Sequence, residues 1–268
     1  MRFKRIPVFN ARDFFMNKSE NNKLYSSGFC TSCGTMHSLE AGSAVRYCHE
    51  LMEKLDKTGR IDFILPKTEA DPAFSTDYLS GKARGQMFGV MVYLDSEKRK
   101  CTARAFSGQY NGRWEVPGWV SPVINASEFY EITQATERKI KSIGRELKQL
   151  PTGSQEYKSL ADNRKRLSQD LMRKIHAIYR LRNFKGTTSP MPDIIHGQKG
   201  IPTGTGDCCA PKLLNFAAVN GFTPLGIAEF YYGKENKSET KLHKHFYPSC
   251  TDKCGLILGF MLCGLDAK

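Results

Sequence analysis

Four cysteines in the C-terminal quarter of the sequence have the residue type and spacing of metal ligands. Cys208 and Cys209 are adjacent, and Cys250 precedes Cys254 by four positions in the string YPSCTDKC. Residues four apart lie on one face of a helix, so Cys250 and Cys254 can hold one ion if a helix begins there. Zinc binds thiolates well, and catalytic zinc sites use three protein ligands and keep one position open. The spacing therefore predicts a zinc site formed by Cys250, Cys254 and a third cysteine, for which we prefer Cys208.

Two carboxylates near these cysteines could move protons. Glu229 lies between the two cysteine pairs in the sequence, and Asp207 directly precedes Cys208. A zinc ion lowers the pKa of a bound water, and a carboxylate beside that water can act as general base and acid. This set predicts a metal-dependent hydrolase. The alternative is that these cysteines are small apolar core residues, a common role of free cysteine.

A second group of metal-ligand residues lies near the N-terminus. Cys30 and Cys33 form a C-x-x-C pair, followed by His37 and then by Cys48 and His49. Such a set has the composition of a zinc knuckle, although the spacing to a fourth ligand is irregular. We expect that a structural zinc here would take Cys48 or His49 as its fourth ligand.

The elements that position the C-terminal cysteines can be predicted from hydrophobic periodicity. Residues 86–110 alternate in polarity on both sides of the polar string SEKRK, as a β-hairpin does. Residues 207–219 predict a helix with Asp207 at its cap, 225–232 a buried strand, and 250–265 a second helix. We therefore expect an α+β fold, in which a small sheet carries packed helices.

The order hairpin, helix, strand, helix resembles the zinc-dependent nucleobase deaminases. In that family the last helix begins with Pro-Cys-x-x-Cys, and a metal-bound hydroxide attacks the base. The resemblance implies metal binding by Cys208, Cys250 and Cys254. Glu229 or Asp207 could supply the acid–base group, although neither stands at the family's motif position. The sequence departs from the family in its C-x-x-x-C spacing, and an alanine stands where the family has its glutamate.

Residues 128–182 predict two long amphipathic helices joined at 151–154, an antiparallel helical hairpin. This stretch holds 13 Lys and Arg against 7 Asp and Glu. One interpretation is a solvated helix surface. The sharper interpretation is contact with the phosphates of a nucleic acid. The residues that would supply the charge are Arg138, Lys139, Lys141, Arg145, Arg164, Lys165, Arg166, Arg173 and Lys174.

The whole chain of 268 residues is basic, with a net charge of +13, which favours polyanionic partners such as RNA.

A composition of 40% hydrophobic and 25% charged residues excludes a disordered tail and a polytopic membrane protein. The longest near-apolar run, 254–265, is too short to span a bilayer. The basic N-terminal segment MRFKRIPVFNARDFF lacks the apolar region of a signal peptide. Nine cysteines, an odd number, favour reduced thiols, and we expect a cytoplasmic protein.

A longer resemblance covers residues 81–266. The segments GDCCAPKLL, AEFYYG and YPSCTDKC occur in this order. Together with the hairpin and the charged helices they resemble an N-terminal extension of some RluA-type pseudouridine synthases. The synthase motif, His-Arg-Leu-Asp followed by Thr-Ser-Gly, does not occur in this sequence. The resemblance therefore implies an RNA-associated module without synthase activity of its own, with RNA and a separate synthase as partners.

Three functions stay open at this point. The chain is an RNA-associated module, a deaminase-like zinc hydrolase acting on a nucleobase, or a non-catalytic structural or interaction protein. For its organisation we expect an N-terminal region, 1–80, and an α+β core formed by 81–127 and 183–268. The helical hairpin 128–182 would be an insertion in that core.

Overall fold

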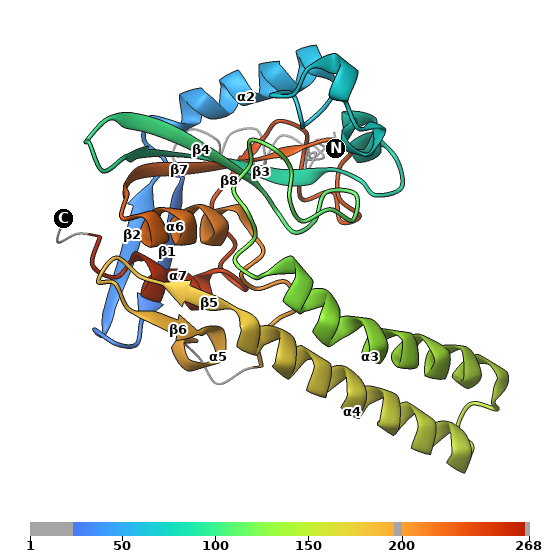
Figure 1. Ribbon diagram of the computed structural model, residues 1–268. Helices are drawn as coiled ribbons and strands as arrows, with labels where there is room; N and C mark the ends of the chain where they lie inside the picture. The colour runs from blue at the N-terminus through green and yellow to red at the C-terminus, as the bar shows by residue number, and fades with distance from the viewer. Residues whose placement is uncertain (1–23, 196–199, 266–268) are drawn as a thin grey trace, which may run out of the picture.

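The computed structural model describes residues 24–195 and 200–265 and confirms the α+β class (Figure 1). The basic N-terminal segment lies outside the described residues. An antiparallel sheet with strand order β4-β3-β7-β8 forms the centre of the molecule. Its strands are β3 (Gln86–Leu94), β4 (Lys100–Phe106), β7 (Thr223–Tyr232) and β8 (Phe246–Tyr247). The predicted hairpin is therefore β3 and β4, and the predicted strand 225–232 is β7, which pairs directly with β3.

The central sheet separates two hydrophobic cores, because successive side chains of a strand point to opposite faces. On β3, Phe88 and Val90 belong to one core, and Met91 and Tyr93 to the other. The first face is covered by α2 (Ala44–Thr58), whose buried residues recur at helical spacing. The second face is covered by α6 (Cys209–Asn220), and α7 (Gly255–Leu262) packs against α6.

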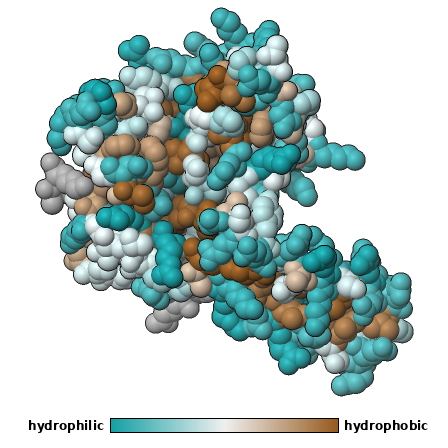
Figure 2. Space-filling view, viewed as in Figure 1, coloured by the Kyte–Doolittle hydropathy of each residue, from teal (hydrophilic) through white to brown (hydrophobic). Residues whose placement is uncertain are grey.

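Two long helices occupy the range predicted as a helical hairpin. We call α3 (Ala126–Glu146) and α4 (Gln155–Ile178) together the arm; they lie side by side and project from the body (Figure 1). Asn125 caps α3 and Ser154 caps α4, each side chain accepting a backbone N–H bond at 3.1 Å. Figure 2 shows apolar side chains along the seam between the two helices, while the rest of the arm surface is hydrophilic.

The remaining described elements are short. They are β1 (Tyr25–Cys30), β2 (Thr35–Glu40), β5 (Arg180–Arg182), β6 (Thr188–Pro190) and α5 (Met191–Ile194), together with 3-10 turns at Lys67–Glu69, Pro72–Phe74, Thr76–Ser80 and Leu147–Gln149. Strands β1 and β2 form a separate two-stranded hairpin, as do β5 and β6. None of the helices in 24–195 and 200–265 combines the length and the apolar character needed to cross a bilayer.

Helix α7 lies against β1 at direct backbone contact. A Cβ atom on Gly259 would lie 2.1 Å from the carbonyl carbon of Phe29, and one on Gly28 would lie 2.4 Å from the Gly259 nitrogen. Only glycine allows two backbones to approach so closely. This contact carries the C-terminal end of α7 to the tip of the β1-β2 hairpin.

The start of the last helix differs from the prediction. Helix α7 begins at Gly255, not at Cys250, and Cys254 is its N-cap residue. The preceding residues form turns, in which the Cys250 carbonyl accepts the Gly255 N–H at 2.9 Å. Residues 251–253 are polar and exposed, whereas the apolar run that can pack against β1 starts at Gly255. Cys250 and Cys254 therefore do not share a helical face.

Gly259→Ala should destabilise the protein, because its methyl group would overlap the backbone of β1. Overpacking of this kind costs about 1–3 kcal/mol of unfolding free energy. Gly255→Ala is the matched control in the same helix, since its nearest new contact would be an ordinary 3.8 Å. Urea unfolding measures both variants. Equal stability of Gly259→Ala and the wild type would contradict the seating of α7 on β1.

Candidate metal centre

Four potential ligands, Cys30, Cys33, His37 and Cys263, converge at the tip of the β1-β2 hairpin; we call them the metal centre. Their ligand atoms all lie within 4.8 Å of one another. The Cys263 Sγ lies 3.7 Å from the Cys33 Sγ, which lies 3.1 Å from the His37 Nε2. Tetrahedral ligands at a Zn–S distance of about 2.3 Å would be about 3.8 Å apart. The cluster could therefore hold a metal ion after little movement.

The turn between β1 and β2 positions three of these ligands. Cys30 is the last residue of β1, Cys33 lies in the turn, and His37 lies on β2. Gly34 closes the turn with a φ of 69° and donates its N–H to the Cys30 carbonyl at 2.9 Å. Side chains other than glycine rarely adopt that backbone conformation. The C-x-x-C pair and the histidine thus meet through local structure alone.

The fourth ligand comes from the other end of the chain. Cys263 is the C-cap residue of α7, and its N–H donates to the Phe260 carbonyl at 3.1 Å. It reaches the hairpin because Gly259, one turn earlier, contacts the backbone of β1. A metal ion bound here would join the N-terminal hairpin to the C-terminal helix.

The prediction that Cys48 or His49 supplies the fourth ligand is wrong. Both residues belong to α2, on the sheet face opposite α6. The Cys48 thiol is buried and donates to the Ala228 carbonyl at 3.3 Å, and the His49 ring packs edge-on against Phe246 with centroids 5.1 Å apart. Cys48 is packed in the core beneath α2, and His49 lies exposed on the same helix, so neither residue belongs to the metal centre.

The thiols of the metal centre differ in pKa. The His37 ring, at hydrogen-bond distance, lowers the pKa of the Cys33 thiol to about 6. Burial, together with the neighbouring Cys33 and Cys30, raises the pKa of the Cys263 thiol to about 11. At neutral pH Cys33 is therefore a thiolate and Cys263 a thiol. Metal ligation requires thiolates, so binding an ion would release the Cys263 proton, and affinity would rise with pH.

The predicted site of Cys208, Cys250 and Cys254 is brought together only in part. Cys208 is the N-cap residue of α6, and its thiol hydrogen-bonds with that of the buried Cys254. Cys250 is exposed in the turn before α7. Within the described parts of the chain, the three thiols do not form a group whose ligand atoms all lie within 4.8 Å. Their role as metal ligands stays a prediction.

Glu229 is buried on the face of β7 that α6 covers. It accepts a hydrogen bond from Ser249 Oγ at 2.6 Å, and Ser26 Oγ lies 2.7 Å from that hydroxyl. Burial raises the pKa of Glu229, while hydrogen bonds from Ser249, the Ala210 backbone and the Cys209 thiol oppose the rise. The donors around the carboxylate, at the N-terminus of a helix, therefore offset only part of the cost of burying its charge.

Asp207 and Lys212 lie near the start of α6, and Lys212 is not among the residues predicted from the sequence. Asp207 accepts the Tyr179 hydroxyl at 2.5 Å, and burial raises its pKa. Lys212 is buried, and its Nζ donates to the carbonyls of Phe106 and Gly108 at 2.9 and 2.7 Å. Burial lowers the pKa of Lys212 to about 8. The only sequence signal for this lysine is its apolar surroundings in the string APKLL.

The basic residues predicted to contact nucleic acid all lie on the arm, and all nine are exposed. Lys141 pairs with Glu137 at 3.3 Å, and Arg173 pairs with Asp170. The other seven form no ion pair with any residue of 24–195 or 200–265. A hollow along the arm is lined by charged groups from both helices and the turn after α3, namely Arg138, Lys141, Arg145, Lys148 and Arg164.

Comparisons of this chain with protein-family models, with curated proteins and with solved structures find no match. The resemblances to the synthase extension and to the deaminases therefore rest on the sequence segments alone.

In chelator-treated protein, Cys33 should be the first thiol that iodoacetamide alkylates. Its thiolate is present above a pH of about 6 and is lost below it, because the pKa is lowered to about 6. Mass-spectrometric peptide mapping between about pH 5 and 8 measures this profile. The exposed Cys250 is the internal control. If Cys33 is alkylated only at pH values at which Cys250 also reacts, the contact between Cys33 and His37 is contradicted.

Proposed function

We propose that this chain is an RNA-associated module that binds structured RNA through the arm and is stabilised by a structural zinc ion. The observation that carries this proposal is a set of seven exposed cations on two projecting helices, none of which forms an ion pair with the described residues. The resemblance to an extension of RluA-type pseudouridine synthases supports the choice of RNA. In this proposal the chain has no synthase activity and acts beside a separate synthase.

The arm places its charge in a form suited to a phosphate backbone. Arg138, Lys141, Arg145 and Lys148 follow one another at spacings of three and four, which keeps them on one side of a helix. They span eleven residues, or about 15 Å of helix axis. Arg164 of α4 approaches this row, with its guanidinium carbon 3.7 Å from the Cβ position of Gly144. Each phosphate that such cations neutralise releases counterions, which makes binding depend on salt.

Zinc is the metal that the centre fits best. Three thiolates and one imidazole are soft and borderline ligands, which select zinc over calcium or magnesium. Four protein ligands fill a tetrahedral shell and leave no position for substrate, so the ion would be structural. In this proposal the ion fixes the β1-β2 hairpin to α7 and thereby to the body that carries the arm.

A deaminase-like hydrolase is the second candidate, favoured by the contact between Cys208 and Cys254 close to Glu229. A zinc ion there would need Cys250 to turn inward as a third ligand. Glu229 would then exchange its bond with Ser249 for a proton-transfer role at the nucleobase. This candidate requires a second zinc ion per chain, which the first does not.

Replacing the arm cations by glutamine should weaken RNA binding and reduce its salt dependence. The variant carries Gln at positions 138, 141, 145, 148 and 164. The slope of log affinity against log salt should fall by about 0.7–0.9 for each lost phosphate contact. Fluorescence anisotropy with a structured RNA measures both quantities.

The matched control removes five exposed cations of the body, Lys57, Lys67, Lys82, Lys100 and Arg113, again as Gln. It should bind RNA much more tightly than the arm variant. Equal weakening in the two variants would show that only net charge matters. Absence of RNA binding at low salt would overturn the proposed function.

Cys263→Ser should remove the structural zinc and lower thermal stability, because a structural ion contributes its binding energy to folding. Wild-type protein purified without chelator should hold one zinc per chain by mass spectrometry, and the Cys250→Ser control should keep it. A Cys263→Ser protein that retains its zinc would overturn the ligand set. Two zinc ions per chain, one of them lost in Cys250→Ser, would instead favour the second candidate.

A further inference from the structure

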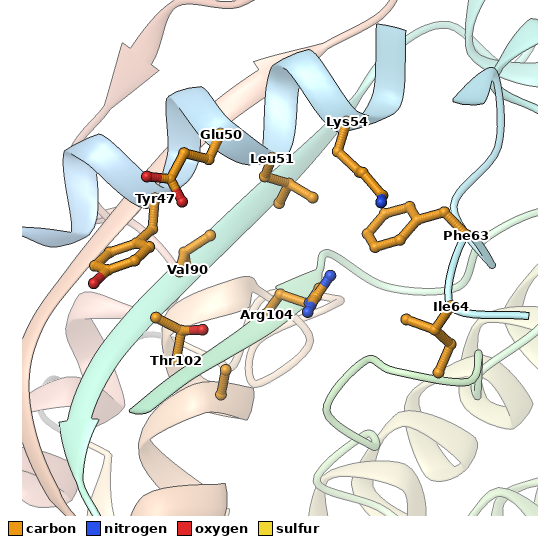
Figure 3. Close-up of a pocket in the computed structure, with 10 residues that line it drawn as sticks. Tyr47, Glu50, Leu51, Lys54, Phe63, Ile64, Val90, Thr102 and Arg104 are labelled. Carbon is orange, nitrogen blue, oxygen red and sulfur yellow. The ribbon is translucent and has the colours of Figure 1, made fainter. Parts of the chain in front are cut away.

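A hollow opens on the α2 face of the central sheet, apart from both the arm and the metal centre (Figure 3). It lies between α2, the segment that follows it and the edge strand β4. Its volume of about 370 Å³ is within the range of small-molecule sites, about 300–1,000 Å³. Tyr47 and Glu50 line one end and Lys54, Phe63 and Ile64 the other, and Arg104 points between them.

Arg104 is a half-buried cation of this hollow that has no anion beside it among the described residues. Its guanidinium lies 5.1 Å from the centre of the Phe63 ring, and its side chain has no hydrogen bond or ion pair with any residue in 24–195 or 200–265. Glu50, which supplies the carboxylate among the lining residues, is bound instead by Arg46 at 2.9 Å. Burial lowers the pKa of Arg104, which reflects the cost of desolvating an unpaired charge. A bound anion would offset that cost.

The rest of the lining combines a second cation with flat and apolar surfaces. The Lys54 Nζ lies 5.6 Å from the centre of the Phe63 ring, next to Arg104. Leu51 and Val90 form an apolar floor, and the Tyr47 ring stands at the far end. Guanidinium and ammonium groups recognise phosphate, and aromatic side chains are the usual partners of unstacked bases.

We propose that this hollow binds a nucleoside phosphate. Arg104 and Lys54 hold the phosphate, and the base lies over the apolar floor against Tyr47. The Glu50 carboxylate then accepts a hydrogen bond from a base amino group. The ligand is either one nucleotide of an unpaired RNA segment or a free nucleotide, since both present the same chemistry. The site goes beyond the proposed function, because it uses no residue of the arm.

The test titrates AMP, UMP, inorganic phosphate and a short single-stranded RNA into wild-type protein and into Arg104→Gln. Calorimetry measures affinity, and Trp119, whose ring centre lies 6.1 Å from that of Phe63, provides a fluorescence signal. Arg104→Gln should weaken nucleotide binding by about tenfold or more, the usual effect of losing a hydrogen bond to a charged group. Arg99→Gln, on the turn before β4, is the control of equal charge and should bind as the wild type does.

The two sources of ligand give different outcomes. Binding of AMP or UMP that depends on Arg104 supports the site with a free nucleotide. Binding of the single-stranded RNA alone, dependent on Arg104 and retained in the arm variant, supports it with an RNA nucleotide. The proposal is overturned if wild type and Arg104→Gln bind nucleotides equally well, or if no nucleotide ligand binds. It is also overturned if nucleotides bind no more tightly than inorganic phosphate. None of these results tests the salt-dependent binding of structured RNA by the arm. That proposal is tested separately by the arm variant.

Discussion

The contact between the backbones of Gly28 and Gly259 fixes how the two ends of the described chain meet. With no Cβ on either residue, α7 lies directly on β1, and a methyl group on Gly259 would overlap the Phe29 carbonyl. Cys263 follows one turn later and arrives beside Cys33 at 3.7 Å. The same placement of α7 sets Cys254 beside Cys208 at the start of α6. Both cysteine groups therefore depend on one close approach of helix and strand.

The arm differs from the body in how many of its cations lie in the open. Some cations of the body are paired, as Arg60 is with Asp62 at 2.6 Å, or buried on carbonyl oxygens, as Lys212 is, whereas the nine predicted cations of the arm are all exposed. Where they project from the body, the two helices pack against each other along a narrow apolar seam (Figure 2). Seven of the nine predicted cations form no ion pair with the described residues, and a polyanion can replace the small ions around them at a gain in entropy.

Features set by local sequence could be predicted, and those set by tertiary packing could not. The β3-β4 hairpin, β7 and the helices of the arm follow from periodicity. Cys263 could not be recognised as a ligand, because only the seating of α7 brings it to the hairpin. The start of α7 was misplaced because the helix begins where apolar packing begins. In the sequence, Arg104 cannot be told apart from the other basic residues. Only the structure shows that it lines a hollow and forms no ion pair with the described residues.

X-ray absorption at the zinc edge tests the metal centre most directly. For the metal centre we predict three sulfur atoms at about 2.3 Å and one nitrogen at about 2.0–2.1 Å from a single zinc ion. That shell requires Cys263 to join Cys30, Cys33 and His37. A shell with two sulfur atoms and additional oxygen or nitrogen would contradict it, because the N-terminal hairpin would then hold the ion without α7.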